Sequence, residues 1–187
     1  MRKLILVKHA APVVTPGVPS ERWPLSADGK LAARHLAEAL RPLAPAAVVA
    51  SLEPKAAETG EIVAAALGVP FEAAAFLHEH DRSNVPHLPT REFIGMMEVL
   101  FRKPTEHVLG RESAAEALAR FRPAVEAAAE RYPTGNLAVV SHGTVIALLL
   151  AQLGGGRGFE LWRRMAQPSY AVVDVPAWRV ERVVDRA

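Results

Sequence analysis

Short apolar runs alternate with segments of helical length along most of this chain, and this order constrains the fold more than any other feature. Residues 3–7, 46–50 and 137–141 are rich in aliphatic side chains and are bounded by loop-forming residues, as buried strands are. Alanine-rich or amphipathic segments separate them. Strands that alternate with helices form a mostly parallel sheet with helices on both faces. The sequence therefore predicts an α/β fold, a three-layer α/β/α sandwich.

Capping signals mark the helices between these strands. Ser26 is a good N-cap, and the helix after it is expected to bury a stripe of Leu31, His35, Leu36, Ala39 and Leu40. Ser113 and Glu116 form a capping box, and Pro123 predicts a kink or split in the helix that follows. The expected helices cover residues 26–40, 55–67, 113–131 and 144–153.

The rest of the chain divides into strands and one irregular insertion. Residues 71–77 suggest a third strand, and residues 170–175 and 178–184 suggest a late hairpin. Residues 78–112 are too few for a core of their own, so we interpret them as a lid inserted into a single domain that spans residues 1–187. The late strands leave two arrangements open, a covered sheet edge or a surface that pairs two copies into a homodimer.

Composition limits the function classes. The net charge is only +2 and no basic stripe is evident, which argues against a nucleic-acid partner. The chain has no cysteine, so disulfides, thiolate metal sites and a cysteine nucleophile are excluded. No stretch approaches the roughly 20 apolar residues of a membrane span, and the first apolar run is too short for a signal peptide. We expect a cytoplasmic protein without a membrane partner.

Two histidines follow strands directly. Lys8 and His9 come after the first strand, and His142 and Gly143 come after the strand over 137–141. The carboxyl ends of parallel strands meet at one edge of the sheet, where open α/β folds bind their ligands. Imidazole can act there as nucleophile, acid or base near neutral pH.

A third strand end adds an anion site. Ser51 leads into Pro54 and Lys55 at the expected start of a helix, whose free N–H groups favour an anion. With Lys8, the predicted pocket holds two lysines, two histidines and a helix N-terminus. This inventory suits a phosphoryl group, whose transfer depends mainly on positioning and charge neutralisation.

These motifs resemble those of the histidine phosphatase superfamily, the phosphoglycerate mutase-like fold. The family's Arg-His-Gly appears here as Lys8-His9-Ala10, and its late Ser-His-Gly as Ser141-His142-Gly143. The motif Ser-x-x-x-Arg-Ala-x-x-Thr appears as Ser51, Lys55, Ala56 and Thr59; Leu-x-Glu as Leu77-His78-Glu79; and Gly-x-Glu-Ser as Gly110, Glu112 and Ser113. The match runs in order along nearly the whole chain.

The resemblance implies a role for each residue. His9 would be the nucleophile that becomes a phosphohistidine, and His142 would contact the phosphoryl oxygens. Glu79 would protonate the leaving group and then activate water, with Asp81 as the alternative acid. Lys8, Lys55 and Gly143 complete the phosphate site. The resemblance implies a phosphomonoester hydrolase acting on a small phosphorylated substrate, with no metal and no cofactor.

Three alternatives stay open at this point. Lysines replace both family arginines, and a lysine lacks the two-pronged grip of a guanidinium on phosphate. A non-catalytic phosphate- or phosphoprotein-binding module of the same fold is therefore one alternative. A phosphoglycerate mutase-type phosphotransferase is another, although the lid is short. The third is a metal cluster of His78, His80 and His87, and we expect lid residues that screen substrates instead.

Overall fold

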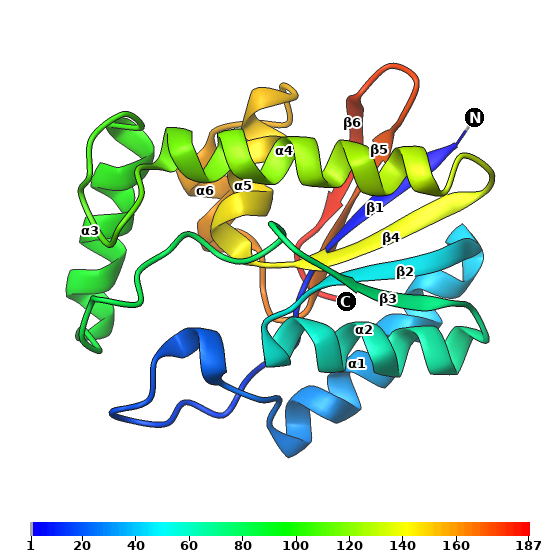
Figure 1. Cartoon of the computed structure of the whole chain (residues 1–187), viewed down its shortest axis with the longest axis horizontal. Helices are drawn as coiled ribbons and strands as arrows, with labels where there is room; N and C mark the ends of the chain where they lie inside the picture. The colour runs from blue at the N-terminus through cyan, green and yellow to red at the C-terminus, as the bar shows by residue number, and fades with distance from the viewer. Residues whose placement is uncertain (1) are drawn as a thin grey trace.

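The computed structural model describes residues 2–187, which form one six-stranded sheet in the order β3-β2-β4-β1-β5-β6 (Figure 1). The strands β1 to β4 pair with one another in parallel, whereas β5 is antiparallel to β1 and β6 is antiparallel to β5. Their bounds are β1 Lys3–Lys8, β2 Pro45–Ser51, β3 Phe71–Ala74, β4 Asn136–Ser141, β5 Ser169–Asp174 and β6 Arg179–Val184. The sheet is thus mixed but mostly parallel, as expected.

Helices cover both faces of the sheet, which confirms the three-layer α/β fold. Helices α1 (Ala27–Leu40) and α2 (Pro54–Leu67) lie against one face, and α4 (Ala114–Arg131), α5 (Gly143–Gln152) and α6 (Gly158–Arg164) lie against the other (Figure 1). Helix α3 (Thr90–Arg102) stands at the end of the molecule beside α6. Short 3₁₀ turns are found at η1 (Ser20–Arg22) and η2 (Arg41–Leu43).

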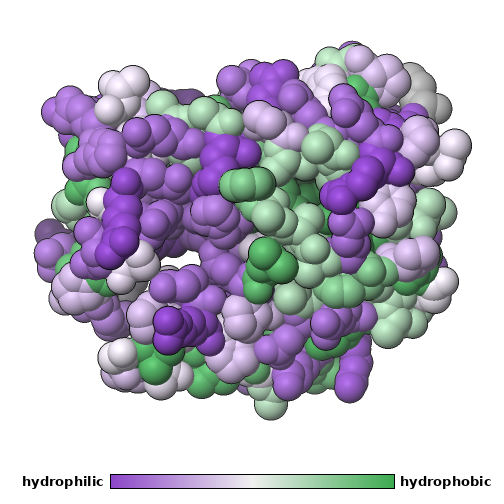
Figure 2. All heavy atoms as spheres, viewed as in Figure 1, coloured by the Kyte–Doolittle hydropathy of each residue, from purple (hydrophilic) through white to green (hydrophobic). Residues whose placement is uncertain are grey.

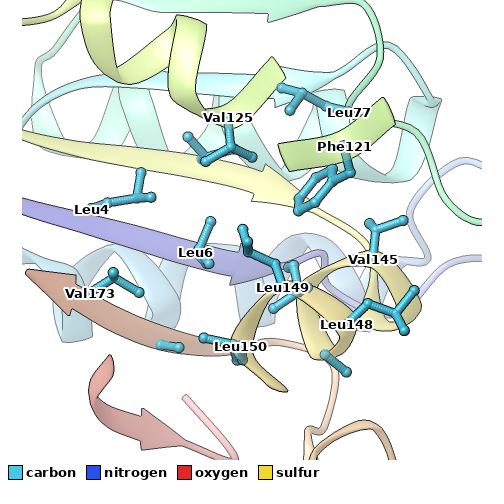
Figure 3. Close-up of a cluster of buried hydrophobic side chains, with 14 of the residues drawn as sticks. Leu4, Leu6, Leu77, Phe121, Val125, Val145, Leu148, Leu149, Leu150 and Val173 are labelled. Atoms are coloured by element: carbon cyan, nitrogen blue, oxygen red, sulfur yellow. The ribbon is translucent and has the colours of Figure 1, made fainter. Parts of the chain in front are cut away.

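The alternation of side chains along β1 explains the two cores. Leu4 and Leu6 point toward Phe121 of α4 and Leu149 of α5 (Figure 3). Ile5 and Val7 point to the opposite face and belong to the other core, with α1 and α2. Successive side chains of a strand face opposite sides of its sheet, so a fully apolar strand needs helices on both. This requirement fixes β1 as a central strand.

Most helix and strand predictions are confirmed, including the late hairpin, and three details differ. The stripe expected on α1 is partly confirmed, because Leu36 and Leu40 are buried. Leu31 and His35 are exposed instead, while small residues such as Ala33 face inward. Helix α4 runs through Pro123 as one element, so no split occurs. Helix α6 was not expected. Among residues 2–187, no helix is long and apolar enough to cross a membrane.

Candidate active site

The ends of β1, β2 and β4 bring the predicted site together. Lys8, Ser51 and Ser141 are the last residues of these three strands, and Lys8 lies directly opposite Ser141 in the sheet. The backbone N–H of His9 donates to the Ser141 carbonyl over 3.0 Å, which extends the parallel pairing one residue past β1. His9 and the start of α5 therefore lie side by side at the carboxyl edge of the sheet.

His9 and His142 are in direct contact. Their ring centroids are 5.1 Å apart in an edge-to-face arrangement, and both side chains are buried. The Nδ1 atom of His9 lies 2.7 Å from the Ala10 carbonyl oxygen, which can only accept, so Nδ1 carries the proton. The Ala10 N–H in turn donates to Thr59 Oγ1 over 3.1 Å. This tautomer leaves the Nε2 lone pair of His9 available as a nucleophile.

Burial keeps both histidines neutral. Loss of hydration lowers the pKa of His9 well below its usual value, and the nearby His142 and Lys55 lower it further. Burial is also the main cause of the lowered pKa of His142, with Lys55 adding to it. A neutral imidazole keeps the lone pair that a nucleophile needs, so this environment prepares His9 for attack at neutral pH.

Both lysines have partly occupied ammonium groups. Lys8 Nζ donates to the Met165 carbonyl over 2.7 Å, and Lys55 Nζ donates to the Ser20 carbonyl over 2.7 Å and to the Glu53 carboxylate over 2.5 Å. An ammonium has three donors, so Lys8 keeps two for a ligand and Lys55 keeps one. Burial lowers the pKa of Lys8.

Glu53 is a site residue that the sequence analysis missed. Its carboxylate pairs with Lys55, accepts a hydrogen bond from the Glu79 N–H over 2.9 Å and lies 3.7 Å from His142 Nε2. His142 Nε2 is 3.0 Å from Ser51 Oγ. The available signal was the position of Glu53 at the N-cap of α2, where the helix dipole favours an acid.

Glu79 is ionised in the free site. Burial raises the pKa of its carboxyl, but the Arg82 guanidinium and two backbone N–H donors outweigh burial and hold the pKa well below its usual range. The donors belong to His80, over 2.8 Å, and Thr144, over 3.1 Å. Arg82 lies 3.4 Å from the carboxylate. Arg82 is thus a third cation of the site, which the motif comparison did not include.

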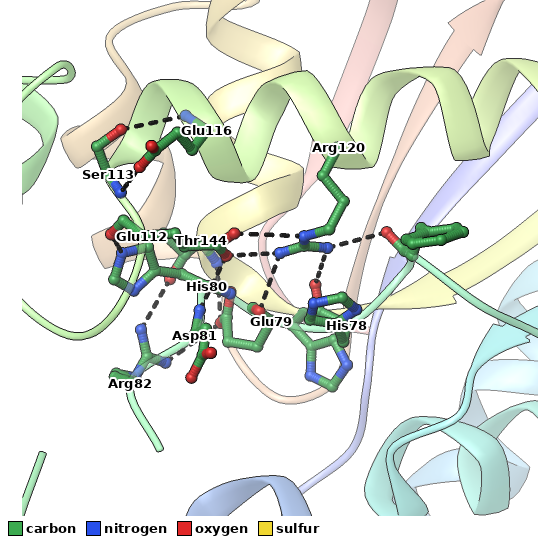
Figure 4. Close-up of polar contacts among 12 residues, drawn as sticks. His78, Glu79, His80, Asp81, Arg82, Glu112, Ser113, Glu116, Arg120 and Thr144 are labelled. Carbon is green, nitrogen blue, oxygen red and sulfur yellow. Dashed lines mark hydrogen bonds and ion pairs between the residues drawn. The ribbon is translucent and has the colours of Figure 1, made fainter. Parts of the chain in front are cut away.

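Arg120 of α4 fixes the backbone that carries Glu79 (Figure 4). Its guanidinium donates to the carbonyls of Phe76, His78 and Glu79 and to the Glu112 carboxylate, over distances between 2.6 and 3.4 Å. Glu112 also accepts a hydrogen bond from the Asp81 N–H over 2.9 Å. This network holds the backbone around Glu79 in place.

The other candidate residues of the 78–112 segment either form hydrogen bonds within that segment or line the cavity. His80 is buried, with Nε2 2.6 Å from the Glu112 carbonyl, and the Asp81 carboxylate accepts from Ser83. Asp81 does not line the cavity beside His9, whereas His87 does. No group of three or more histidines and acids within residues 2–187 is arranged to hold a metal ion.

A cavity of about 660 Å³ opens beside these groups. Lys8, His9, Lys55, Glu79 and Gly143 line it, so five of the six predicted site residues reach it, as does Arg82. His142 is fully buried and does not itself line it, but its ring contacts that of His9. The space-filling view shows a hollow between the 78–112 segment and residues 12–19, the Pro-rich loop after β1 (Figure 2). The size lies within the roughly 300–1,000 Å³ of small-molecule sites.

At the carboxyl edge of a mostly parallel sheet, the cavity is thus lined by one histidine of a buried pair and by three cationic side chains. The family sequence model of the histidine phosphatase superfamily (branch 1) matches residues 4–185, so the chain belongs to this superfamily.

Solved structures show the same fold at low identity. A mycobacterial glucosyl-3-phosphoglycerate phosphatase is 20% identical, with a TM-score of 0.79 over 100% of this chain and 99% of that chain. An α-ribazole phosphatase from Shigella flexneri is 21% identical, with a TM-score of 0.75 over 98% and 96%. No curated protein matches the sequence.

Proposed function

We propose that this protein is a metal-independent phosphomonoester hydrolase that acts on a small phosphorylated substrate through a phosphohistidine on His9. The observation that carries the proposal is the Nε2 lone pair of a neutral His9 in a cavity that Lys8, Lys55 and Arg82 also line. These cations supply the charge that a phosphoryl group needs. Family membership supports the same chemistry.

In the first step, His9 Nε2 attacks phosphorus while the bond from phosphorus to the ester oxygen breaks. The free donors of Lys8 and Lys55 hold the nonbridging oxygens, and the Gly143 N–H lies at the start of α5, where the helix dipole favours an anion. His142 Nδ1 has no hydrogen-bond partner within residues 2–187, and we assign it to donate to a phosphoryl oxygen.

Binding of the substrate dianion favours the uptake from solvent of the proton that Glu79 lacks in the free site. With neutral histidines, three cations and two carboxylates leave one net positive charge, and a phosphate dianion turns it into one net negative charge. A negative site favours proton uptake. Glu79 then protonates the leaving alkoxide in the first step. In the second step it takes a proton from water, which attacks phosphorus and releases inorganic phosphate from His9.

We further propose that residues 78–112 act as the substrate-screening lid of a single domain. Ser83, Val85 and Leu88 line the cavity opposite the Pro-rich loop, so a ligand would have to pass between the two segments.

The test is the covalent intermediate itself. The protein is mixed with phenyl phosphate in the presence of a chelator, and an acid-labile phosphoryl adduct at His9 is sought by rapid quench and mass spectrometry. We expect turnover and the adduct in wild type and in His35→Ala, whose side chain is exposed on α1. His9→Ala is expected to lose both. Turnover that survives in His9→Ala would overturn the mechanism.

One observation favours a second candidate, a phosphate-binding module without turnover. A backbone carbonyl occupies one donor of each lysine, and Glu53 occupies a second donor of Lys55. Fewer hydrogen-bond donors are therefore left for a transition state than two free arginines would provide. In the same experiment, this function would give phosphate binding with neither adduct nor turnover.

A further inference from the structure

The cavity beside His9 extends past the space that a phosphoryl group needs, and its outer part has apolar walls. Phe93 of α3 and Trp162 of α6 form one wall, with ring centroids 5.8 Å apart in an edge-to-face arrangement. Val14, Val18 and Trp23, from the chain between β1 and α1, line the cavity as well. A ligand bound through its phosphate would place its alcohol part among these side chains.

The aromatic wall is preformed. Trp162 stacks on Phe159, with ring centroids 5.9 Å apart and planes 14° from parallel, and Phe101 packs beside both rings. The Arg82 guanidinium lies 5.2 Å from the centre of the Phe93 ring. Rings held by neighbours on several sides lose little freedom when a ligand binds, so the contact retains more of its free energy.

The Pro-rich loop exposes aliphatic side chains at the same cavity. Val14 is 52% exposed and Val18 is 38% exposed. The loop is nevertheless held in place, because Trp23 Nε1 donates to the Val18 carbonyl over 2.9 Å and the Val13 N–H donates to the Pro24 carbonyl over 2.8 Å. Exposed apolar side chains grouped in a cavity mark a surface that a ligand covers.

Few charged side chains of the described residues line the cavity, and of these only Arg82 reaches the outer wall, beside Phe93. Among its lining residues in the described chain, 2–187, the lysines, arginines and acids are Lys8, Lys55, Glu79 and Arg82. Arg82 is already paired with Glu79. A second anionic group on the substrate would therefore meet an apolar surface without a free cation, and burying it there would cost free energy.

We infer that the site selects phosphate monoesters whose alcohol part is an uncharged, planar, apolar ring and disfavours esters that carry a carboxylate or a second phosphate. As a statement about turnover, the inference rests on the proposed function. As a statement about binding, it stands on the cavity walls alone.

Three esters of primary alcohols test the selection without a large difference in leaving group: 2-phenylethyl phosphate, ethyl phosphate and the phosphate ester of 3-hydroxypropanoate. Burial of the phenyl group is expected to raise kcat/KM about 10- to 100-fold over ethyl phosphate. The carboxylate ester is expected to fall below ethyl phosphate. Equal values for the three esters, or a preference for the carboxylate, would overturn the inference.

A matched pair of variants locates the selectivity. Val14→Lys places a cation in the outer cavity, and it is expected to reduce the preference for the phenylethyl ester over the carboxylate ester by about tenfold or more. Val13→Lys is the control, because Val13 is similarly exposed, at 44%, but does not line the cavity. Equal effects of the two variants would show that the cavity wall is not the cause.

Unreactive phosphonates separate this inference from catalysis. Binding of 3-phenylpropylphosphonate and of propylphosphonate is followed by the fluorescence of Trp23 and Trp162, which both line the cavity. Tighter binding of the phenyl compound, by about tenfold or more, without turnover of any ester would support the inference while the proposed hydrolase function fails. Turnover with equal binding of the two phosphonates would overturn the inference and leave the hydrolase function standing.

Discussion

The Glu53 carboxylate accepts a hydrogen bond from Lys55 Nζ over 2.5 Å, and both side chains are buried at the N-terminus of α2. The site therefore contains its own anion, bound to one of the cations that the motif assigns to phosphate. A phosphoryl group that binds Lys55 has to share it with Glu53. This competition leads to the first prediction.

Glu53→Gln is expected to bind inorganic phosphate roughly tenfold more tightly, because Lys55 is then free of a competing charge. The free energy of unfolding without ligand is expected to fall by about 1–3 kcal/mol, since a buried ammonium loses its charged partner. Thermal unfolding with and without phosphate measures both effects. Glu106→Gln is the control, because its pair with Lys103 is exposed and contributes at most about 1 kcal/mol. Unchanged phosphate affinity in Glu53→Gln would contradict the competition.

Gly143→Ala is expected to displace Lys8. A Cβ at position 143 would lie 3.1 Å from Lys8 Cε and 3.3 Å from Nζ, so the lysine must shift. We expect kcat/KM to fall about tenfold, because small misplacements of a charged group are costly in a transition state. Gly95→Ala of α3 is the control, with no heavy atom within 4 Å of its Cβ, and should gain roughly 0.5–1 kcal/mol of stability at unchanged activity. Full activity in Gly143→Ala would show that Lys8 tolerates movement.

Arg120→Lys is expected to lower kcat about 10- to 100-fold, because an ammonium cannot hold three carbonyls and the Glu112 carboxylate together. Arg120 is a positioning residue, so the inhibition constant of inorganic phosphate should stay within about twofold, and the pH profile of kcat should shift as Glu79 moves. Arg122→Lys, on the same helix and paired with Glu126, serves as the control. A loss of phosphate binding equal to the loss of kcat would argue for general misfolding instead.

Stability should fall on the acid side of neutrality. His9 and His142 have pKa values below their unfolded value of about 6.5, so below that pH the unfolded chain binds protons that the folded chain does not. Their contribution is complete about one pH unit above 6.5 and is lost as the pH falls, at up to about 1.4 kcal/mol per pH unit for each histidine. Urea unfolding between pH 5 and 8 measures the slope, which should be smaller in His9→Gln. An equal slope in that variant would refute the assignment.

The sequence was sufficient to predict the positions that depend on strand ends. His9 and His142 are in contact because each directly follows a parallel strand. The position of Lys55 could be predicted because it lies in the first turn of α2, directly after the end of β2. Glu53 and Arg82 could not be assigned, because their roles depend on side-chain directions that only tertiary contacts determine. The stripe on α1 was partly misplaced, because small residues such as Ala33 allow close packing against α2, while Leu31 turns outward. Pairing of two copies and a cytoplasmic location stay predictions.

Arg82 contacts both the acid and the wall of the outer cavity, since its guanidinium lies 3.4 Å from the Glu79 carboxylate and 5.2 Å from the centre of the Phe93 ring. Under the proposed function, the side chains that select the substrate and the acid that sets the rate therefore depend on the same guanidinium. A substitution that reshapes the wall at Phe93 will also move the counter-ion of Glu79. Evolution or design toward a new substrate would have to adjust both at once, most simply by changes on the Pro-rich loop, which lies across the cavity from this pair.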